Sequence, residues 1–377
     1  MRPRIAVAHE WMTNWAGSEQ VVGEIAGLVR PDEVVASIVS PEVAARHLPG
    51  TPVRGLWPSR LPGATEHWTR YAPAIMASWR TARIDADVLV VSAHFAAHAA
   101  AARFDGPSLV YYHTPARMLW RPEIELARLP RAARGVVGSA VLPALRAVDR
   151  RASAGADRVL ANSRAVADRV RAAYGREAHV VHPPVEVEGW GTVPREPAGH
   201  LLWLGRLVAY KRPDLAVEVS RRTGIPLLVV GDGPERERLE RSAPPSVRFA
   251  GRLPSSAVRE AVSGASALIF PGEEDFGIAP VEVLAAGVPV VAHAAGGALD
   301  FVQHGVNGLL VAPQTVEAFA AAAREAVRIG QAGGWDTGAI RRSALPFSAQ
   351  EFRTRFGEQL DSLIGTGWRQ DREARTS

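Results

Sequence analysis

Short apolar segments alternate with longer amphipathic segments along this chain. Several of the short segments are apolar on both faces, which is typical of parallel strands that helices cover on both sides. In the first half we expect strands at residues 4–9, 34–39, 87–92, 108–113, 158–161 and 179–182, and helices at 17–29, 66–81 and 163–174. In the second half we expect strands at 200–204, 226–230, 247–250, 267–270, 289–292 and 308–311, and helices that begin at Pro213, Pro234, Ser256, Ala279 and Thr315. This repetition predicts the α/β class with doubly wound, Rossmann-like domains.

A stretch rich in proline, glycine and glutamate, residues 183–199, interrupts the alternation as a linker does. A chain of 377 residues is also too long for one ordinary hydrophobic core. We therefore predict an N-terminal domain at residues 1–185, a linker at 186–199 and a C-terminal domain at 200–347, with the two domains facing each other across a cleft.

The last segment, residues 348–377, has an apolar stripe at helical spacing. Phe352, Phe356, Leu360 and Leu363 follow one another at intervals of four, four and three residues. This spacing predicts a helix with one apolar face, which could pack onto either domain. We expect it to return to the N-terminal domain.

The composition narrows the class of protein. Hydrophobic residues make up 47% and charged residues 22% of the chain, as in a soluble globular enzyme. The absence of cysteine excludes disulfides, thiolate metal sites and a cysteine nucleophile. No apolar stretch approaches the about 18 residues of a membrane span, and no signal-peptide pattern is present. We expect a cytoplasmic protein, with peripheral contact at the inner face of the cell membrane as a further option.

The positive charge is concentrated in one segment, residues 115–151. Its eight arginines are Arg117, Arg121, Arg128, Arg131, Arg134, Arg146, Arg150 and Arg151, and its acids are Glu123, Glu125 and Asp149. The resulting excess equals the net charge of +5 of the whole chain. Apolar residues lie between the arginines, so the segment could bind an anionic membrane or an acidic ligand. An ordinary helical insertion with a solvated face is the alternative. Nucleic acid is disfavoured because no nucleic-acid-binding motif accompanies the charge.

Lys211 is the only lysine among 44 basic residues. It follows the strand expected at 200–204, in a turn that also contains Gly205 and Arg206. Ligands of doubly wound sheets bind at such strand ends, and a lysine ammonium is a compact charge that can contact one phosphate oxygen. Arg206 and Lys211 could therefore hold a diphosphate. The alternative is that Lys211 has no functional role and is a lysine retained by chance at the solvent-exposed start of a helix.

Two acids stand eight positions apart in a strand-loop-helix unit at residues 271–282. We expect Glu274 in the loop and Glu282 in the first turn of the helix. One carboxylate could then bind a ribose diol and the other the hydroxyls of a hexose. Considered individually, acidic residues at the start of a helix usually stabilise it by interacting with the positive end of the helix dipole.

Together these motifs resemble the retaining glycosyltransferases of family 4, which have the GT-B fold. Glu274-x7-Glu282 with Phe276, Gly277 and Ile278 between the acids is similar to the family signature, and Gly205-Arg206 with Lys211 is similar to its diphosphate clamp. Gly17-Ser18-Glu19 corresponds to the first strand-to-helix loop, where Ala16 replaces the first of two glycines.

Tyr112-His113-Thr114-Pro115 corresponds to the loop that carries a histidine beside the transferred sugar. His9, His94 and His98 could equally be core or turn residues. The resemblance implies a catalytic set of His113, Arg206, Lys211 and Glu274. It implies a donor site of Gly17, Gly205, Arg206, Lys211, Glu274, Phe276, Gly277, Ile278 and Glu282 in a C-terminal nucleotide-sugar domain that faces an N-terminal acceptor domain.

The amino-acid sequences of these motifs are most similar to those of GDP-mannose-dependent mannosyltransferases of O-antigen and exopolysaccharide synthesis. This implies a hexosyltransferase with a nucleotide-sugar donor and a saccharide acceptor, for which we expect a lipid-linked molecule. The alternatives are a UDP- or dTDP-sugar with a soluble acceptor, an epimerase, a phosphorylase with pyridoxal phosphate on Lys211, and a non-catalytic sugar-nucleotide binder. We expect no metal and no other cofactor, because no Asp-x-Asp pattern is present and the two cations could neutralise a leaving diphosphate.

Overall fold

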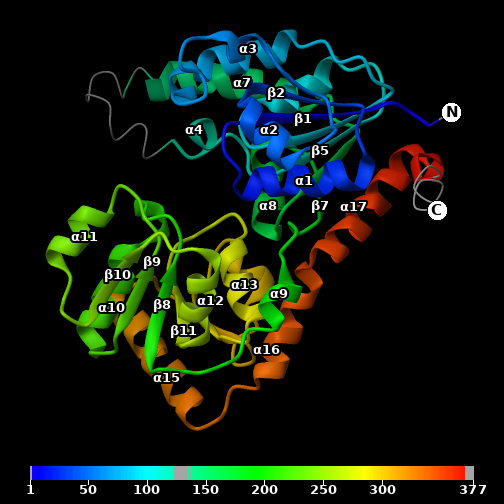
Figure 1. Ribbon diagram of the computed structural model, residues 1–377. Coiled ribbons are helices and arrows are strands. Elements are labelled where there is room, and N and C mark those ends of the chain that lie inside the picture. Colours follow the sequence, from blue (N-terminus) through cyan, green and yellow to red (C-terminus); the bar gives the residue numbers. More distant parts are fainter. Residues whose placement is uncertain (1, 123–134, 136, 370–377) are drawn as a thin grey trace. The chain divides into compact units, whose positions relative to one another are not determined.

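The computed structural model describes residues 2–122, 135 and 137–369, which form two compact units (Figure 1). The first unit comprises the chain up to His182 together with the segment from Phe352 onward, and the second comprises Pro183–Glu351. Each unit contains one parallel sheet with helices on both faces, so the predicted pair of Rossmann-like α/β domains is confirmed. Among the described residues, no helix is long and apolar enough to cross a membrane.

The first unit has a seven-stranded sheet in the order β3-β2-β1-β4-β5-β6-β7. The strands are β1 (Ile5–Met12), β2 (Glu33–Val39), β3 (Val53–Gly55), β4 (Val88–Ala93), β5 (Ser108–Tyr112), β6 (Arg158–Ala161) and β7 (His179–Val180). The helices are α1 (Gly17–Val29), α2 (Pro41–His47), α3 (Ala72–Thr81), α4 (Arg117–Trp120), α7 (Leu142–Ser153), α8 (Arg164–Tyr174) and α17 (Ala349–Ile364). Shorter turns are η1 (Trp57–Arg60), η2 (Trp68–Tyr71), η3 (Ala97–Arg103), η4 (Val137–Val141) and η7 (Thr366–Arg369).

Alternate residues of the strands feed two separate cores in this unit. Helices α3, α7 and α8 and the turn η3 pack on one face, whereas α1 and α17 pack on the other (Figure 1). The C-terminal stripe lies in α17, where Phe352, Phe356 and Leu360 are buried in the second of these cores. An ion pair between Arg353 Nη1 and Glu24 Oε2 at 2.7 Å joins α17 to α1.

The second unit has a six-stranded sheet in the order β10-β9-β8-β11-β12-β13. The strands are β8 (His200–Leu204), β9 (Leu227–Val230), β10 (Val247–Gly251), β11 (Ala265–Phe270), β12 (Val290–His293) and β13 (Gly308–Val311). The helices are α9 (Val187–Gly191), α10 (Pro213–Thr223), α11 (Arg236–Ser242), α12 (Ser255–Ser263), α13 (Ile278–Ala285), α14 (Ala298–Phe301), α15 (Val316–Gln331) and α16 (Thr337–Ala344), with short turns η5 (Ala209–Lys211) and η6 (Leu345–Phe347). Helices α10 and α15 cover one face of the sheet, and α9, α12, α13 and α16 cover the other.

Both sheets reverse their strand order next to the first strand of the unit. In the first unit this point lies between β1 and β4, and in the second between β8 and β11. The loops after these strands diverge to opposite faces, so the carboxyl edge opens there and can admit a ligand.

The single helix expected at residues 66–81 is a wrong prediction, because this segment forms η2 followed by α3. Pro73 stands in the first turn of α3, a position that suits proline at the start of a helix but not inside one.

Candidate functional site

Lys211 and Glu274 form an ion pair at the carboxyl edge of the second sheet. Lys211 Nζ lies 2.8 Å from Glu274 Oε1, and the two side chains are 20% and 16% exposed. Lys211 ends η5 after β8, and Glu274 lies in the loop after β11. Since β8 and β11 are paired neighbours, the strand order brings together two residues that are far apart in the sequence.

Two glycines hold the loops of this pair in close contact. A Cβ atom at Gly272 would lie 2.6 Å from Cα of Lys211, and a Cβ atom at Gly296 would lie 2.4 Å from the carbonyl oxygen of Glu274. Gly296 also has a φ of +62°, which disfavours side chains. Any larger residue would therefore push the lysine and the acid apart.

Arg206 extends the positive side of this edge. It follows Gly205 directly at the end of β8, and its side chain is exposed to solvent. Leu207 behind it is fully buried, so the loop is anchored while Arg206 faces outward. Arg206 and Lys211 thus present two cations on one loop, an arrangement suited to a diphosphate.

Glu282 lies in the second turn of α13, not in the first turn as expected, because the helix begins at Ile278. Burial raises the pKa of Glu282 to about 7, and repulsion from Glu186 acts in the same direction. A hydrogen bond from Trp190 and the charge of Arg259 oppose this rise. Glu282 therefore titrates near neutral pH and can both donate and accept a hydrogen bond there.

The residues between the two acids serve the loop and the helix start. The ring of Phe276 is buried, with its centroid 5.7 Å from that of Phe301 and 5.6 Å from that of Phe347. Gly277 adopts a left-handed conformation with φ of 102°, and Ile278 is the first residue of α13. Phe276 therefore supports the loop from the core side, and a ligand contact of these three residues stays a prediction.

In the first unit, His113 belongs to a row of polar side chains, of which Ser92, His9 and Glu19 are buried. Its Nε2 atom lies 2.8 Å from Ser92 Oγ, and Ser92 Oγ lies 3.1 Å from Nδ1 of His9. Nε2 of His9 lies 3.8 Å from Glu19 Oε1. The row connects the end of β5 to β4, β1 and α1. From the sequence alone, His9 is equally compatible with a core or turn position, and no pattern in the sequence points to Ser92.

Electrostatics keep His113 neutral. Burial lowers the pKa of His113 to about 3, and the nearby His9 adds repulsion. Burial alone would raise the pKa of Glu19, but its interaction with the nearby His9 brings it below its usual value. A neutral imidazole can donate from one ring nitrogen and accept at the other, so His113 is suited to bind a hydroxyl group rather than an anion.

The residues Gly17-Ser18-Glu19 form the first turn of α1, as the helix expected at residues 17–29 implies, and their assignment to the preceding loop is wrong. Glu19 Oε2 accepts hydrogen bonds from the Ala16 amide at 3.2 Å and from Ser18 Oγ at 3.0 Å. The carboxylate thus satisfies amide groups at the helix start while its other oxygen faces His9. Close approach of a ligand to Gly17 stays a prediction.

Glu10 is a structural anchor that sequence reasoning missed. Its Oε1 atom accepts hydrogen bonds from the backbone amides of four consecutive residues, His94, Phe95, Ala96 and Ala97, at 2.7–3.1 Å. Burial raises its pKa, although these amides act against the rise. The sequence signal for this role is an acidic residue inside an apolar strand. The strand expected at residues 4–9 ends before Glu10, so the apolar pattern alone does not place Glu10 in the strand.

The described part of the basic segment includes α4 and α7. Arg128, Arg131 and Arg134 lie outside the described residues. In α7, the guanidinium groups of Arg146 and Arg150 each lie 5.4 Å from the ring centroid of Trp120. Part of the charge in this segment is therefore used in cation–π packing. In the described ranges no three histidine or acidic side chains are grouped as metal ligands, and metal independence stays a prediction.

Two family models match the two halves of the chain. Residues 15–188 match the model described as Glycosyltransferase Family 4, and residues 193–331 match the model described as Glycosyl transferases group 1. The boundary between the matches falls close to the boundary between the two structural units. Each half of the chain therefore has its own independent match.

Curated relatives are similar over parts of their length. A GDP-mannose-dependent alpha-mannosyltransferase of Corynebacterium glutamicum is 36% identical over 110 residues, which are 29% of this chain and 26% of the relative. A GDP-mannose-dependent alpha-(1-6)-phosphatidylinositol monomannoside mannosyltransferase of Mycobacterium tuberculosis is 30% identical over 256 residues, 57% of this chain and 66% of the relative. The matches thus span from about a quarter to just under two thirds of these relatives.

A solved structure covers almost the whole chain. The structure of Anabaena HepE in complex with UDP and glucose matches with a TM-score of 0.71 and 18% identity, over 96% of this chain and 100% of that chain. At this identity the likeness concerns the fold.

Proposed function

We propose that this chain is a glycosyltransferase that transfers a hexose from a nucleotide diphosphate sugar to a saccharide acceptor. Its two halves match glycosyltransferase models, and its two sheets are those of the GT-B fold. The observation that carries this proposal is the ion pair of Lys211 and Glu274 beside Arg206, at the edge of the sheet where ligands of such domains bind.

The paired charges are matched to the two ends of a sugar diphosphate. A diphosphate can take the place of Glu274 on Lys211 and can also contact the exposed Arg206. The hydroxyl groups of the sugar can in turn donate hydrogen bonds to the released carboxylate of Glu274. The donor thus replaces one internal ion pair by several charge-assisted hydrogen bonds, and the free protein already holds these groups in position.

We propose that transfer retains the anomeric configuration through a same-face reaction. The bond between C1 of the sugar and the diphosphate oxygen breaks, the bond between C1 and the acceptor oxygen forms, and the acceptor's proton passes to the leaving oxygen. Lys211 and Arg206 stabilise the negative charge that develops on the diphosphate, a role that a metal ion plays in other transferases. Neutral His113 binds a sugar hydroxyl, and Ser92 orients its ring.

GDP-mannose is the donor that we propose first, because the relatives at 30% and 36% identity are named as GDP-mannose-dependent enzymes. A UDP-sugar is the second candidate, because the solved structure that matches almost the whole chain holds UDP and glucose. For the acceptor we propose a lipid-linked saccharide, supported by the name of the Mycobacterium tuberculosis relative and by the basic segment at residues 115–151.

Thermal shift with GDP, UDP, GDP-mannose and UDP-glucose identifies the donor, since a ligand at 100 times its dissociation constant stabilises the protein by about 2.7 kcal/mol. NMR of the anomeric proton of the product then distinguishes retention from inversion, and rates with and without EDTA test the need for metal. Failure of all four ligands to stabilise the protein, with no transfer to a lipid-linked or a soluble acceptor, would refute the proposal.

A further inference from the structure

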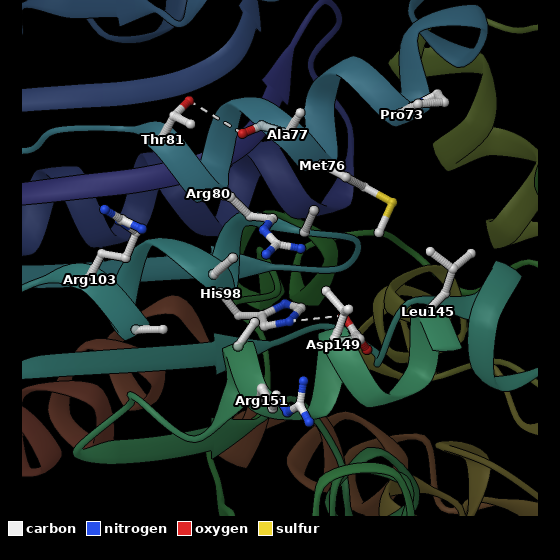
Figure 2. A pocket seen from close by; sticks show the side chains of 15 residues that line it. Pro73, Met76, Ala77, Arg80, Thr81, His98, Arg103, Leu145, Asp149 and Arg151 are labelled. Carbon is white, nitrogen blue, oxygen red and sulfur yellow. Dashed lines mark hydrogen bonds and ion pairs between the residues drawn. The ribbon is translucent and has the colours of Figure 1, made fainter. Parts of the chain in front are cut away.

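A groove on the surface of the first unit runs between α3 and α7, with η3 as its floor (Figure 2). The alanine-rich sequence of η3 and of the residue before it explains the groove, because Ala96, Ala99 and Ala102 are too short to fill the space between the helices. Its volume is about 670 Å³. This is within the range of about 300–1,000 Å³ typical of sites for small organic ligands.

The groove is apolar at one end and basic at the other. Pro73 and Met76 of α3 and Leu145 of α7 line the apolar end (Figure 2). Arginines line the other end, and each stands in the last turn of its own element: Arg80 in α3, Arg103 in η3 and Arg151 in α7. All three elements lead back toward the amino ends of the strands, so their last turns lie at one end of the groove.

The arginines of the groove have no internal counter-charge. In the part of the chain that the structure describes, Arg80, Arg103 and Arg151 make no ion pair. Some other arginines of the same unit do form ion pairs, as Arg4 does with Asp85 at 3.0 Å. The groove therefore carries an uncompensated positive charge at one end only.

The single acid in the groove is already neutralised by its neighbours. Asp149 lies 3.1 Å from Nε2 of His98, and both side chains are buried in the floor. Asp149 also accepts hydrogen bonds from Trp120 Nε1 at 2.7 Å and from the Tyr174 hydroxyl at 2.9 Å. The floor thus contributes no free negative charge, and the polarity of the groove is set by its arginines.

We propose that this groove binds an anionic membrane phospholipid, with a hydrocarbon chain between α3 and α7 and the phosphate against Arg80, Arg103 and Arg151. An apolar channel alone would accept many hydrophobic molecules, and three arginines alone would accept many anions. A channel that is apolar at one end and cationic at the other fits an amphiphile with a phosphate head. The site goes beyond the proposed sugar transfer, because it contains no residue of the proposed donor site.

A soluble single-chain phosphate allows a direct test on the full-length protein. Calorimetry compares dodecyl phosphate below its critical micelle concentration with dodecyl maltoside and with inorganic phosphate. We expect measurable binding of dodecyl phosphate only. Decyl phosphate has two methylenes fewer and should bind about 15-fold more weakly, because each buried methylene contributes about fourfold to affinity.

Two variants separate the head from the chain. The double substitution Arg80→Gln/Arg103→Gln should weaken the binding of dodecyl phosphate about 30-fold, because each arginine contributes a little over fivefold, about 1 kcal/mol, to the affinity. Ala77→Trp fills the groove from an exposed position of α3 and should weaken binding at least about tenfold. Matched controls are Arg46→Gln/Arg222→Gln, which removes the same charge elsewhere, and Ala172→Trp on an exposed position of α8. Neither control should change the affinity.

Several results would overturn the proposal. Equal binding of dodecyl phosphate and dodecyl maltoside would remove the role of the arginines, and equal binding of inorganic phosphate would reduce the groove to an anion site. Arginines in the last turns of helices also offset the helix dipole. If Arg80→Gln/Arg103→Gln lowered only the melting temperature and left dodecyl phosphate binding unchanged, the arginines would be structural, they would not hold the phosphate, and the proposed site would be wrong.

Discussion

Replacing Lys211 by arginine keeps the positive charge and changes its shape. In the folded protein, Lys211 Nζ lies 2.8 Å from Glu274 Oε1, and a Cβ atom at Gly205 would lie 3.7 Å from the same ammonium. The backbone of Lys211 is equally confined, because a Cβ atom at Gly272 would lie 2.6 Å from its Cα. A planar guanidinium is wider than an ammonium, so an arginine must leave this position or displace Glu274.

We expect Lys211→Ala to lower kcat/KM by about 100- to 1,000-fold, which corresponds to about 2.7–4 kcal/mol of transition-state stabilisation. Lys211→Arg should lose nearly as much, because the charge is kept but cannot reach the leaving oxygen. Stability should change far less. The side chains of the ion pair are 20% and 16% exposed, so water screens part of its energy and the loss on folding should be about 1–2 kcal/mol.

The assay measures initial rates of nucleotide release with GDP-mannose and an acceptor, together with the melting temperature. A stability loss of this size should lower the melting temperature by only a few degrees, at about 2–4 °C per kcal/mol for a unit of 150–250 residues. Arg222→Ala removes an exposed cation from the last turn of α10 and serves as the control. If Lys211→Arg kept most of its activity, the argument from shape would be wrong.

Other predictions concern the two acids and Ser92. Glu282→Ala should weaken the binding of GDP by about 10- to 100-fold, whereas Glu274→Ala should leave the binding of GDP unchanged and weaken that of GDP-mannose. Calorimetry with both ligands checks this, and equal losses of affinity for both ligands would contradict the assignment. Because the pKa of Glu282 is raised to about 7, affinity for GDP-mannose should rise by up to about tenfold between pH 6 and pH 8, and Glu282→Gln should abolish this slope. The same shift means that Glu282 loses its proton near pH 4.5 in the unfolded chain but only near pH 7 in the folded protein. The free energy of unfolding should therefore fall as the pH rises from 4.5 to 7, and urea titrations should show this fall for the wild type but not for Glu282→Gln. Ser92→Ala removes the hydroxyl partner of His113 Nε2 and leaves Nδ1 of His9 with only the carbonyl oxygen of residue 92; it should cost about 1–3 kcal/mol of stability and lower kcat without changing GDP affinity. An unchanged kcat would exclude a role of Ser92 in orienting His113.

Local patterns in the sequence were sufficient to predict both sheets. Parallel strands that are buried on two faces form short apolar runs, and helices that cover a sheet carry one apolar stripe, so each element is encoded within its own segment. Less regular elements were missed. The strand β3 has only three residues, and η3 is a run of alanines whose role depends on the helices beside it.

The sequence also indicated which loops carry chemistry, since Arg206, Lys211 and Glu274 follow apolar strands in a pattern similar to that of known transferases. Only the tertiary structure decided which side chains meet. Lys211 contacts Glu274 because β11 pairs with β8, and Ser92 joins His9 to His113 because β4 lies between β1 and β5. Strand order results from the packing of both faces of a whole sheet, so no local segment contains it. The same reason hides the arginine-lined groove, whose walls α3 and α7 become neighbours only after the sheet has formed.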